Sequence, residues 1–318
     1  MLKVYKSVGE ALVESDVLGE KGSWINLVNP TREEVEGVAE RLGLPVDFLE
    51  YPLDEEESSR IESEEGCVLV IIRVPVVRDH NYDTIPLGII ITENVIVTIC
   101  LEDLAIINEL YACRIRGFYT YKKTRFLLQL FYLTASHYLR YLRQIDRRSE
   151  EIQQRLHRST ENEELIKLFS LGKSLVYFTT SLRSNEIVME KLLKLHLAKD
   201  PSEINDGLIK MYEEDEDLLE DVITENKQAI EMSEIYAEIL SSTMDAFASI
   251  ISNNLNLVMR FLTSVTIILM IPTMLFSLYG MNVNLPLQQS KAAFPAIVLL
   301  SFILTLVALL FFKKRNML

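Results

Sequence analysis

The chain has 318 residues, of which 49% are hydrophobic and 25% are charged, and its formal net charge is −14. This acidic balance argues against nucleic acid as a partner, because nucleic-acid-binding proteins need a basic face. The sequence also lacks the glycine-rich loop and lysine that hold nucleotide phosphates, so coupling to ATP is not expected. About 255 residues precede the apolar C-terminal region, enough for one or two soluble domains.

The first 116 residues predict an α/β domain. Apolar, β-rich runs predict strands at 2–5, 24–28, 68–74, 85–91 and 95–100. Thr31 and Glu34 have the spacing of a capping box, which predicts a helix that ends near Leu42. The pair Glu93-Asn94 predicts a hairpin turn and therefore a partly antiparallel sheet. Residues 54–65 are expected to form an acidic loop or a short helix.

After residue 100 the sequence becomes rich in helix-forming residues, with no proline between Leu87 and Asp200. Helices are predicted at 101–116, 120–157 and 163–199. Asp200-Pro201-Ser202 marks a break, and a single helix is predicted from there to Tyr279. The expected divisions are an α/β domain at 1–116, a helical section at 117–202 and a long stalk helix at 203–279.

Two apolar runs, 261–279 and 294–312, are each close to the ~20 residues that a helix needs to cross a bilayer. The alternative is a buried helical hairpin of a soluble domain. Basic residues at 313–315 mark the cytoplasmic side. We therefore expect a multi-pass cell-membrane protein with spans at about 258–279 and 294–312, an external loop at 280–293 and a cytoplasmic tail at 313–318. Both termini are then cytoplasmic, and no cleavable signal peptide is expected at the N-terminus.

The residue types that carry catalysis or bind zinc do not form a recognisable pattern. Cys67, Cys100 and Cys113 lie far apart in apolar surroundings, which indicates reduced core thiols. The four histidines show no metal-ligand spacing. No nucleophile with its base is recognisable, so an enzyme is not expected.

One face of the predicted long helix is polar where it crosses the membrane. Hydroxyl residues 263, 266, 273 and 277 share a line with Met270, and the line extends backward through polar and thioether residues. The set, which we call the polar stripe, comprises Asp245, Ser252, Asn256, Met259, Thr263, Thr266, Met270, Thr273 and Ser277. One interpretation is helix–helix packing through small hydroxyl residues. The other is that several copies surround a water-filled path, because a two-span protomer cannot enclose a pore alone. The spacing near 3.5 residues fits helices that supercoil about a common axis.

The four residues Tyr279-Gly280-Met281-Asn282 end the first span and precede a short loop, the second span and the basic cluster. In this position the Gly-Met-Asn triplet resembles the signature of the CorA family of magnesium transporters, and the resemblance covers the whole chain. It implies an α/β cytoplasmic domain, a helical stalk and two C-terminal spans in a funnel-shaped homopentamer embedded in the lipid bilayer.

The resemblance also implies roles for particular residues. Asn282 would form a polar ring at the outer mouth, with Gly280 and Met281 shaping the turn. Leu262 joins the pore lining and forms a hydrophobic constriction with Met259. Asp221 matches an acid that binds regulatory Mg²⁺ between subunits. Its usual acidic partner pair corresponds here to Leu49-Glu50-Tyr51, so that Glu50 or Asp54 would have to replace the missing acid.

The transported and regulatory ion implied is Mg²⁺, which sheds water reluctantly, so a ring of neutral amide oxygens can hold it hydrated. The run 213–221 contains seven acids and is either a solvated helix face or a cation sensor that closes the funnel. The ion preference among Mg²⁺, Co²⁺ and Ni²⁺ is left open. The alternatives are a zinc transporter of the same superfamily, against which Met281 argues, and a membrane-anchored oligomeric scaffold.

Overall fold

The computed structural model describes residues 1–9, 11–64, 66–79, 81–112, 118–156, 162–197, 208–283 and 292–315. Two compact units make up the chain, Met1–Ser242 and Thr243–Leu318. Helix α6 (Glu213–Tyr279) contributes its first part to unit 1 and its second part to unit 2. The two boundaries expected near residues 116 and 202 lie outside the described residues and stay predictions.

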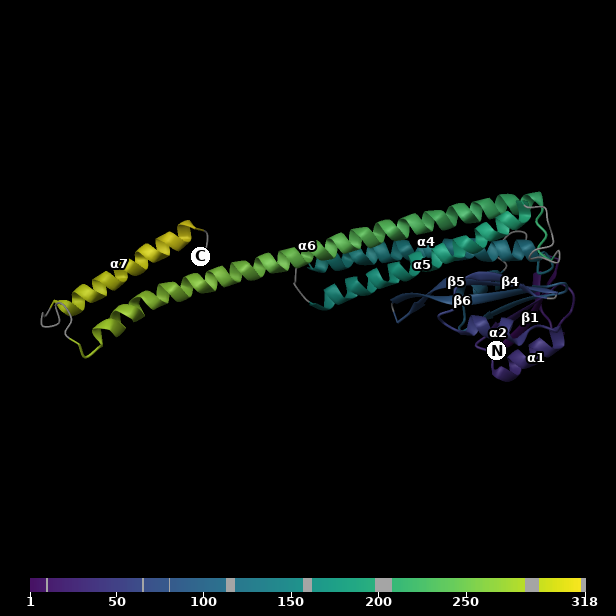
Figure 1. Ribbon diagram of the computed structural model, residues 1–318, viewed down its shortest axis with the longest axis horizontal. Coiled ribbons are helices and arrows are strands. Elements are labelled where there is room, and N and C mark those ends of the chain that lie inside the picture. Colours follow the sequence, from purple (N-terminus) through teal and green to yellow (C-terminus); the bar gives the residue numbers. More distant parts are fainter. Residues whose placement is uncertain are drawn as a thin grey trace. The chain divides into compact units, whose positions relative to one another are not determined.

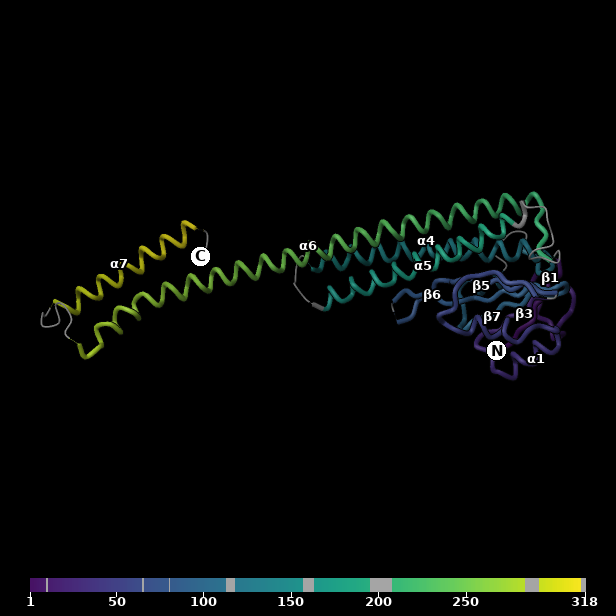
Figure 2. The backbone as a smooth tube through the Cα atoms, in the orientation of Figure 1, coloured from purple at the N-terminus to yellow at the C-terminus, as the bar shows by residue number. Residues whose placement is uncertain are grey.

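Unit 1 contains a seven-stranded mixed sheet (Figures 1 and 2). Among the strands in the described residues, only β3 and β7 pair in parallel, and all other neighbours are antiparallel. In spatial order the strands are β2 (Ala11–Glu14), β1 (Leu2–Val8), β3 (Ser23–Val28), β7 (Ile96–Cys100), β6 (Asn81–Thr92), β5 (Cys67–Arg78) and β4 (Arg60–Glu64).

All five predicted strands are confirmed, and so is the hairpin at Glu93-Asn94, since Ile91 pairs with Ile96. Sequence reasoning missed the two edge strands. β2 has four residues, and β4 is largely charged, so neither shows the apolar run that marks an inner strand. The expectation of a loop or short helix across 54–65 is therefore wrong at β4.

The sheet is covered on both faces. Alternate residues of β5 point to opposite sides: Leu69 and Ile71 belong to the cluster beneath α1 (Arg32–Leu42) and α2 (Val46–Glu50), and Val70 to the other cluster. That second cluster lies under α4 (Lys123–Leu156) and α5 (Asn162–Leu197) (Figure 2). The predicted capping box of α1 is present.

Two predicted helix boundaries differ from the structure. α3 (Ala105–Tyr111) is shorter than the helix predicted at 101–116, whose last residues lie outside the described part. The long helix begins at Glu213 and not near residue 203, since the described residues 208–212 are not helical. The Thr124 hydroxyl donates to the carbonyl of Lys210 at 2.8 Å, and this bond to α4 holds the backbone in a non-helical path.

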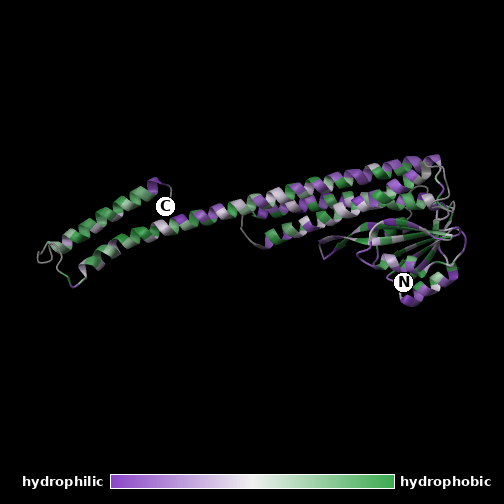
Figure 3. Ribbon diagram, in the orientation of Figure 1, coloured by the Kyte–Doolittle hydropathy of each residue, from purple (hydrophilic) through white to green (hydrophobic). Residues whose placement is uncertain are grey.

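Unit 2 contains the C-terminal part of α6 and helix α7 (Ala293–Lys314), both long and apolar enough to cross a membrane. Figure 3 shows α7 and the end of α6 as almost continuously hydrophobic, whereas the first part of α6 alternates. Pro272 lies inside α6 without ending it. In unit 1, Cys67 and Cys100 are buried and free, and burial raises the pKa of Cys100 to about 12. Cys113 lies outside the described residues.

Candidate ion pathway and its mouth

The polar stripe lies on one side of α6 and follows steps of seven residues. One row contains residues 245, 252, 259, 266 and 273, and a neighbouring row contains 256, 263, 270 and 277. Seven-residue steps keep two rows in line only when helices supercoil at 3.5 residues per turn. All these side chains are exposed in the single chain, from Asp245 to Ser277, and so is Leu262 beside them. The chain itself therefore leaves the stripe uncovered.

A different side of α6 is covered within unit 2. Ser264 is fully buried, and Ile268, Ile271 and Leu275 are partly buried, at steps of four, three and four residues. The corresponding face of α7 contains Ile297, Ser301, Thr305 and Ala308. Small residues such as Ser264 and Ser301 allow two membrane helices to approach closely. We infer that these two faces pack together, which leaves the polar stripe pointing away from α7.

Two of the three threonines of the stripe satisfy their hydroxyl hydrogens internally. Thr266 donates to the carbonyl of Leu262 at 2.8 Å, and Thr273 donates to that of Leu269 at 3.0 Å. Each hydroxyl oxygen then keeps its lone pairs for another donor. A water molecule bound to a cation is such a donor. The stripe can therefore accept hydrogen bonds from a hydrated ion.

The end of α6 is a tight turn at Gly280. Its N–H donates to the carbonyls of Phe276 and Ser277 at 2.9 and 3.2 Å. A Cβ atom on Gly280 would lie 3.3 Å from the Phe276 oxygen, which is a crowded contact. Tyr279 is the last helical residue, and Met281 and Asn282 follow with exposed side chains. The turn thus presents the Asn282 amide at the end of the stripe-bearing helix, and the loop at 284–291 lies outside the described residues.

The acids expected at a regulatory site do not come together within one chain. Asp221 is exposed on α6, Glu50 ends α2, and Asp54 accepts a hydrogen bond from the N–H of Glu56. Over the described ranges, no three His, Cys, Asp or Glu side chains form a metal-binding group. Tyr51, which is expected to stand in place of the second acid, has its ring centroid 4.6 Å from the Arg60 guanidinium carbon.

Part of the acidic run has a structural role that sequence reasoning missed. Arg125 of α4 lies 3.1 Å from Glu214 and 3.7 Å from Asp215, and Asp215 is only 5% exposed. These acids also lie in the first turn of α6, where negative charge is favourable. Arg125 follows Lys122, Lys123 and Thr124 in a polar stretch, so its pairing with α6 left no distinctive signal in the sequence. Asp221, two turns further along, remains exposed and available.

The fold and the stripe define a class: a protein with two C-terminal helices that are long and apolar enough to cross a membrane, the first of which carries a polar stripe. The chain belongs to the CorA-like Mg²⁺ transporter protein family, whose match extends over residues 19–314. It is 29% identical over 304 residues to the cobalt/magnesium transport protein CorA of Methanocaldococcus jannaschii, covering 92% of this chain and 90% of that protein.

Solved structures agree with the family assignment. The complete structure of the CorA magnesium transporter from M. jannaschii matches with a TM-score of 0.82 and 26% identity, covering 99% of this chain and 98% of the other. The ZntB cytoplasmic domain from Vibrio parahaemolyticus matches with a TM-score of 0.58 and 11% identity, covering 80% of this chain and 97% of that domain. The second likeness concerns the fold alone. The predicted family and fold class are confirmed.

Proposed function

We propose that this protein is a channel-like transporter that moves hydrated Mg²⁺ across the cell membrane down its electrochemical gradient. The observation that carries the proposal is the polar stripe, which stays exposed on α6 while another face of the same helix is covered. Hydroxyl and amide oxygens have no reason to face lipid. They suit a water-filled path, and the names of the CorA relatives, a cobalt/magnesium transport protein and a magnesium transporter, support magnesium or cobalt as the cargo.

The path requires several copies of the chain, because one hairpin of α6 and α7 cannot enclose it. We assign a homopentamer with α6 inside and α7 outside, as the family resemblance implies. The basic residues Lys313, Lys314 and Arg315 support a cytoplasmic C-terminus. With two spans, unit 1 is then cytoplasmic as well, and Asn282 faces the outside.

Selection follows from the chemistry of the mouth. Five Asn282 amide oxygens would accept hydrogen bonds from the water molecules around Mg²⁺ and leave that water shell in place. The ring needs no carboxylate, because the ion does not have to be bound tightly. Met259 and Leu262 would form an apolar constriction that closes by dewetting. Co²⁺ or Ni²⁺ of similar hydration would pass by the same route.

Gating is assigned to cytosolic Mg²⁺ bound between neighbouring subunits. Asp221 of one copy would share the ion with Glu50 or Asp54 of the next, since a single chain leaves these acids apart. Bound Mg²⁺ offsets the repulsion between carboxylates and favours the closed form. When the ion leaves, the stalk helices separate. By linkage, the closed form must bind regulatory Mg²⁺ more tightly than the open form.

Two alternative functions can be distinguished from magnesium transport. A zinc transporter is disfavoured by Met281 in the signature triplet, and the likeness to ZntB is one of fold. A membrane-anchored scaffold would need neither the stripe nor Asn282. It would therefore tolerate their replacement.

The test is divalent-ion uptake into liposomes that contain the purified protein. The wild type should take up Mg²⁺ faster than Zn²⁺, and Asn282→Ala should lose most of this uptake. Asn284→Ala, in the loop beyond the signature, is the matched control and should transport normally. Equal uptake by wild type and Asn282→Ala would remove Asn282 as the selector.

A further inference from the structure

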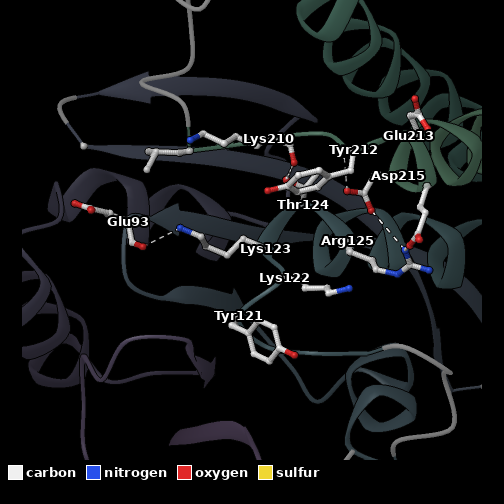
Figure 4. A pocket seen from close by; sticks show the side chains of 13 residues that line it. Glu93, Tyr121, Lys122, Lys123, Thr124, Arg125, Lys210, Tyr212, Glu213 and Asp215 are labelled. Carbon is white, nitrogen blue, oxygen red and sulfur yellow. Dashed lines mark hydrogen bonds and ion pairs between the residues drawn. The ribbon is translucent and has the colours of Figure 1, made fainter. Parts of the chain in front are cut away.

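Unit 1 contains a cavity of about 1080 Å³ that plays no part in the proposed ion pathway. It lies where the start of α4, the β6–β7 hairpin and the start of α6 meet (Figure 4). Four cationic side chains line it: Lys122, Lys123, Arg125 and Lys210. Four acids, Glu93, Glu213, Glu214 and Asp215, line it as well, so the distribution of charge within the cavity matters more than its total.

Lysines gather at one end of this cavity. Lys123 donates from Nζ to the carbonyls of Thr92 and Glu93 at 2.7 and 2.9 Å. Figure 4 shows Lys210 and Lys123 directed toward the side on which Glu93 lies. Burial lowers the pKa of Lys123, and the charges of Lys21 and Lys210 lower it further against the opposing effect of Glu93. The positive charges of Lys21 and Lys210 therefore both repel that of Lys123.

The chain compensates only part of this positive charge. Arg125 is paired with Glu214 and Asp215. Among the described residues, the side chains of Lys21 and Lys210 form no ion pair or hydrogen bond. The first turn of α4 contains no acid, although helix N-termini favour negative charge. The first turn of α6 has four acids. The unbalanced charge is thus on the lysine side of the cavity.

Two tyrosine rings line the same cavity. Tyr121 and Tyr212 are 55% and 71% exposed, so neither is needed to fill the core. Exposed aromatic rings beside basic side chains provide a surface on which a nucleobase can stack. The cavity thus combines cations for phosphate with rings for a base.

We propose that this cavity binds a phosphate-bearing anion, the polyphosphate chain of a nucleotide or free pyrophosphate, with Lys123 and Lys210 as its principal cationic contacts. The anion occupies the point where three elements converge, and it relieves the repulsion among the lysines. Binding does not imply hydrolysis, because the chain has no phosphate-binding glycine loop. The site is independent of Mg²⁺ transport.

The experiment is calorimetric titration of the full-length protein in detergent with pyrophosphate, ATP and adenosine. Free Mg²⁺ is held constant, because polyphosphates chelate it. Lys210→Gln is the main variant, since its exposed side chain has no role in the core. Lys173→Gln on α5, where the amino group lies over the Tyr177 ring, is the matched control. Lys123→Gln is added, with the fluorescence of buried Trp24 reporting whether it folds.

We expect the wild type and Lys173→Gln to bind ATP or pyrophosphate with equal affinity, and Lys210→Gln to bind about tenfold more weakly. Affinity should fall as salt is added. Similar affinities for ATP and pyrophosphate would show that the phosphates are recognised alone, and tighter binding of ATP would show that the tyrosines hold its base. Absence of polyphosphate binding by the wild type, or unchanged affinity in Lys210→Gln, would overturn the proposal. Neither result bears on Mg²⁺ uptake.

Discussion

Ser264 and Thr266 lie two residues apart on α6, and each donates its hydroxyl hydrogen at 2.8 Å to the carbonyl four residues earlier, yet Ser264 is fully buried and Thr266 is exposed. Two residues correspond to about 200° around a helix, so the hydroxyls occupy nearly opposite sides. The burial of one and the exposure of the other separate the side that faces α7 from the side assigned to the ion pathway.

This separation predicts different effects for two substitutions. Ser264→Leu inserts a larger side chain between packed helices and should destabilise unit 2 by about 1–3 kcal/mol. Thr266→Val keeps the shape of the side chain but removes the oxygen, so we expect unchanged thermal stability in detergent and several-fold slower Mg²⁺ uptake. Thermal denaturation and liposome flux measure the two effects. A reversed pattern would mean that the two faces are assigned incorrectly.

Regulation by Mg²⁺ predicts a specific loss in Asp221→Ala. Removing one ligand from an intersubunit site should raise the cytosolic Mg²⁺ concentration that half-inhibits flux by at least about fivefold. Glu220→Ala makes the same charge change on the neighbouring position of α6 and should behave as wild type. Current recorded against cytosolic Mg²⁺ gives the comparison. Unchanged inhibition in Asp221→Ala would exclude Asp221 from the sensor.

Gly88 of β6 is required by close packing. A Cβ atom there would lie 2.2 Å from Pro52 Cγ and 2.9 Å from Ile99 Cγ2, so Gly88→Ala should destabilise unit 1 by about 1–3 kcal/mol. Gly37 of α1 has no atom within 4 Å of such a Cβ, and Gly37→Ala should stabilise by about 0.5–1 kcal/mol through helix propensity. Trp24, the single tryptophan, reports both changes by fluorescence. Equal effects would contradict the contact at Pro52.

The buried His137 predicts a pH dependence. Burial lowers its pKa, although Glu109, whose Oε1 lies 3.2 Å from its Nε2, opposes this effect and Arg140 adds to it. Below the ordinary pKa of about 6.5, the unfolded chain takes up a proton that the folded chain does not. Stability should therefore be greatest above pH 6.5 and fall as the pH drops below it. His137→Leu should flatten this decline in Trp24 unfolding curves, and identical slopes would contradict it.

The sequence predicted the inner strands, the capping box, the two long helices α4 and α5 and both spans, because each is a local pattern of apolar spacing or capping. The start of α6 could not be predicted in the same way. It depends on the contacts of Lys210 and Asp215 with α4, residues that are distant along the chain. The edge strand β4 was missed because its partner, and not its composition, makes it a strand.

The candidate site, like the fold, has features that local sequence patterns predict and features that depend on contacts between distant residues. The stripe and the signature turn were visible in the sequence because helical spacing and a tripeptide carry them. The face of α6 that is directed toward α7 had one indication in the sequence, which is that Ser264 does not lie on the polar stripe. It became clear only when Ser264 and Ser301 proved to be the buried residues of the two membrane segments.

The most direct test is thiol crosslinking in liposomes of protein carrying a single added cysteine on α6, at Thr266 or at Ile268. The background is the Cys113→Ala protein, whose remaining cysteines, Cys67 and Cys100, are buried. If copies of α6 surround a common path, Thr266→Cys should crosslink neighbouring subunits readily, and Ile268→Cys, on the face toward α7, should not. Crosslinking at Ile268 without crosslinking at Thr266, or a protein that is monomeric in lipid, would contradict the account.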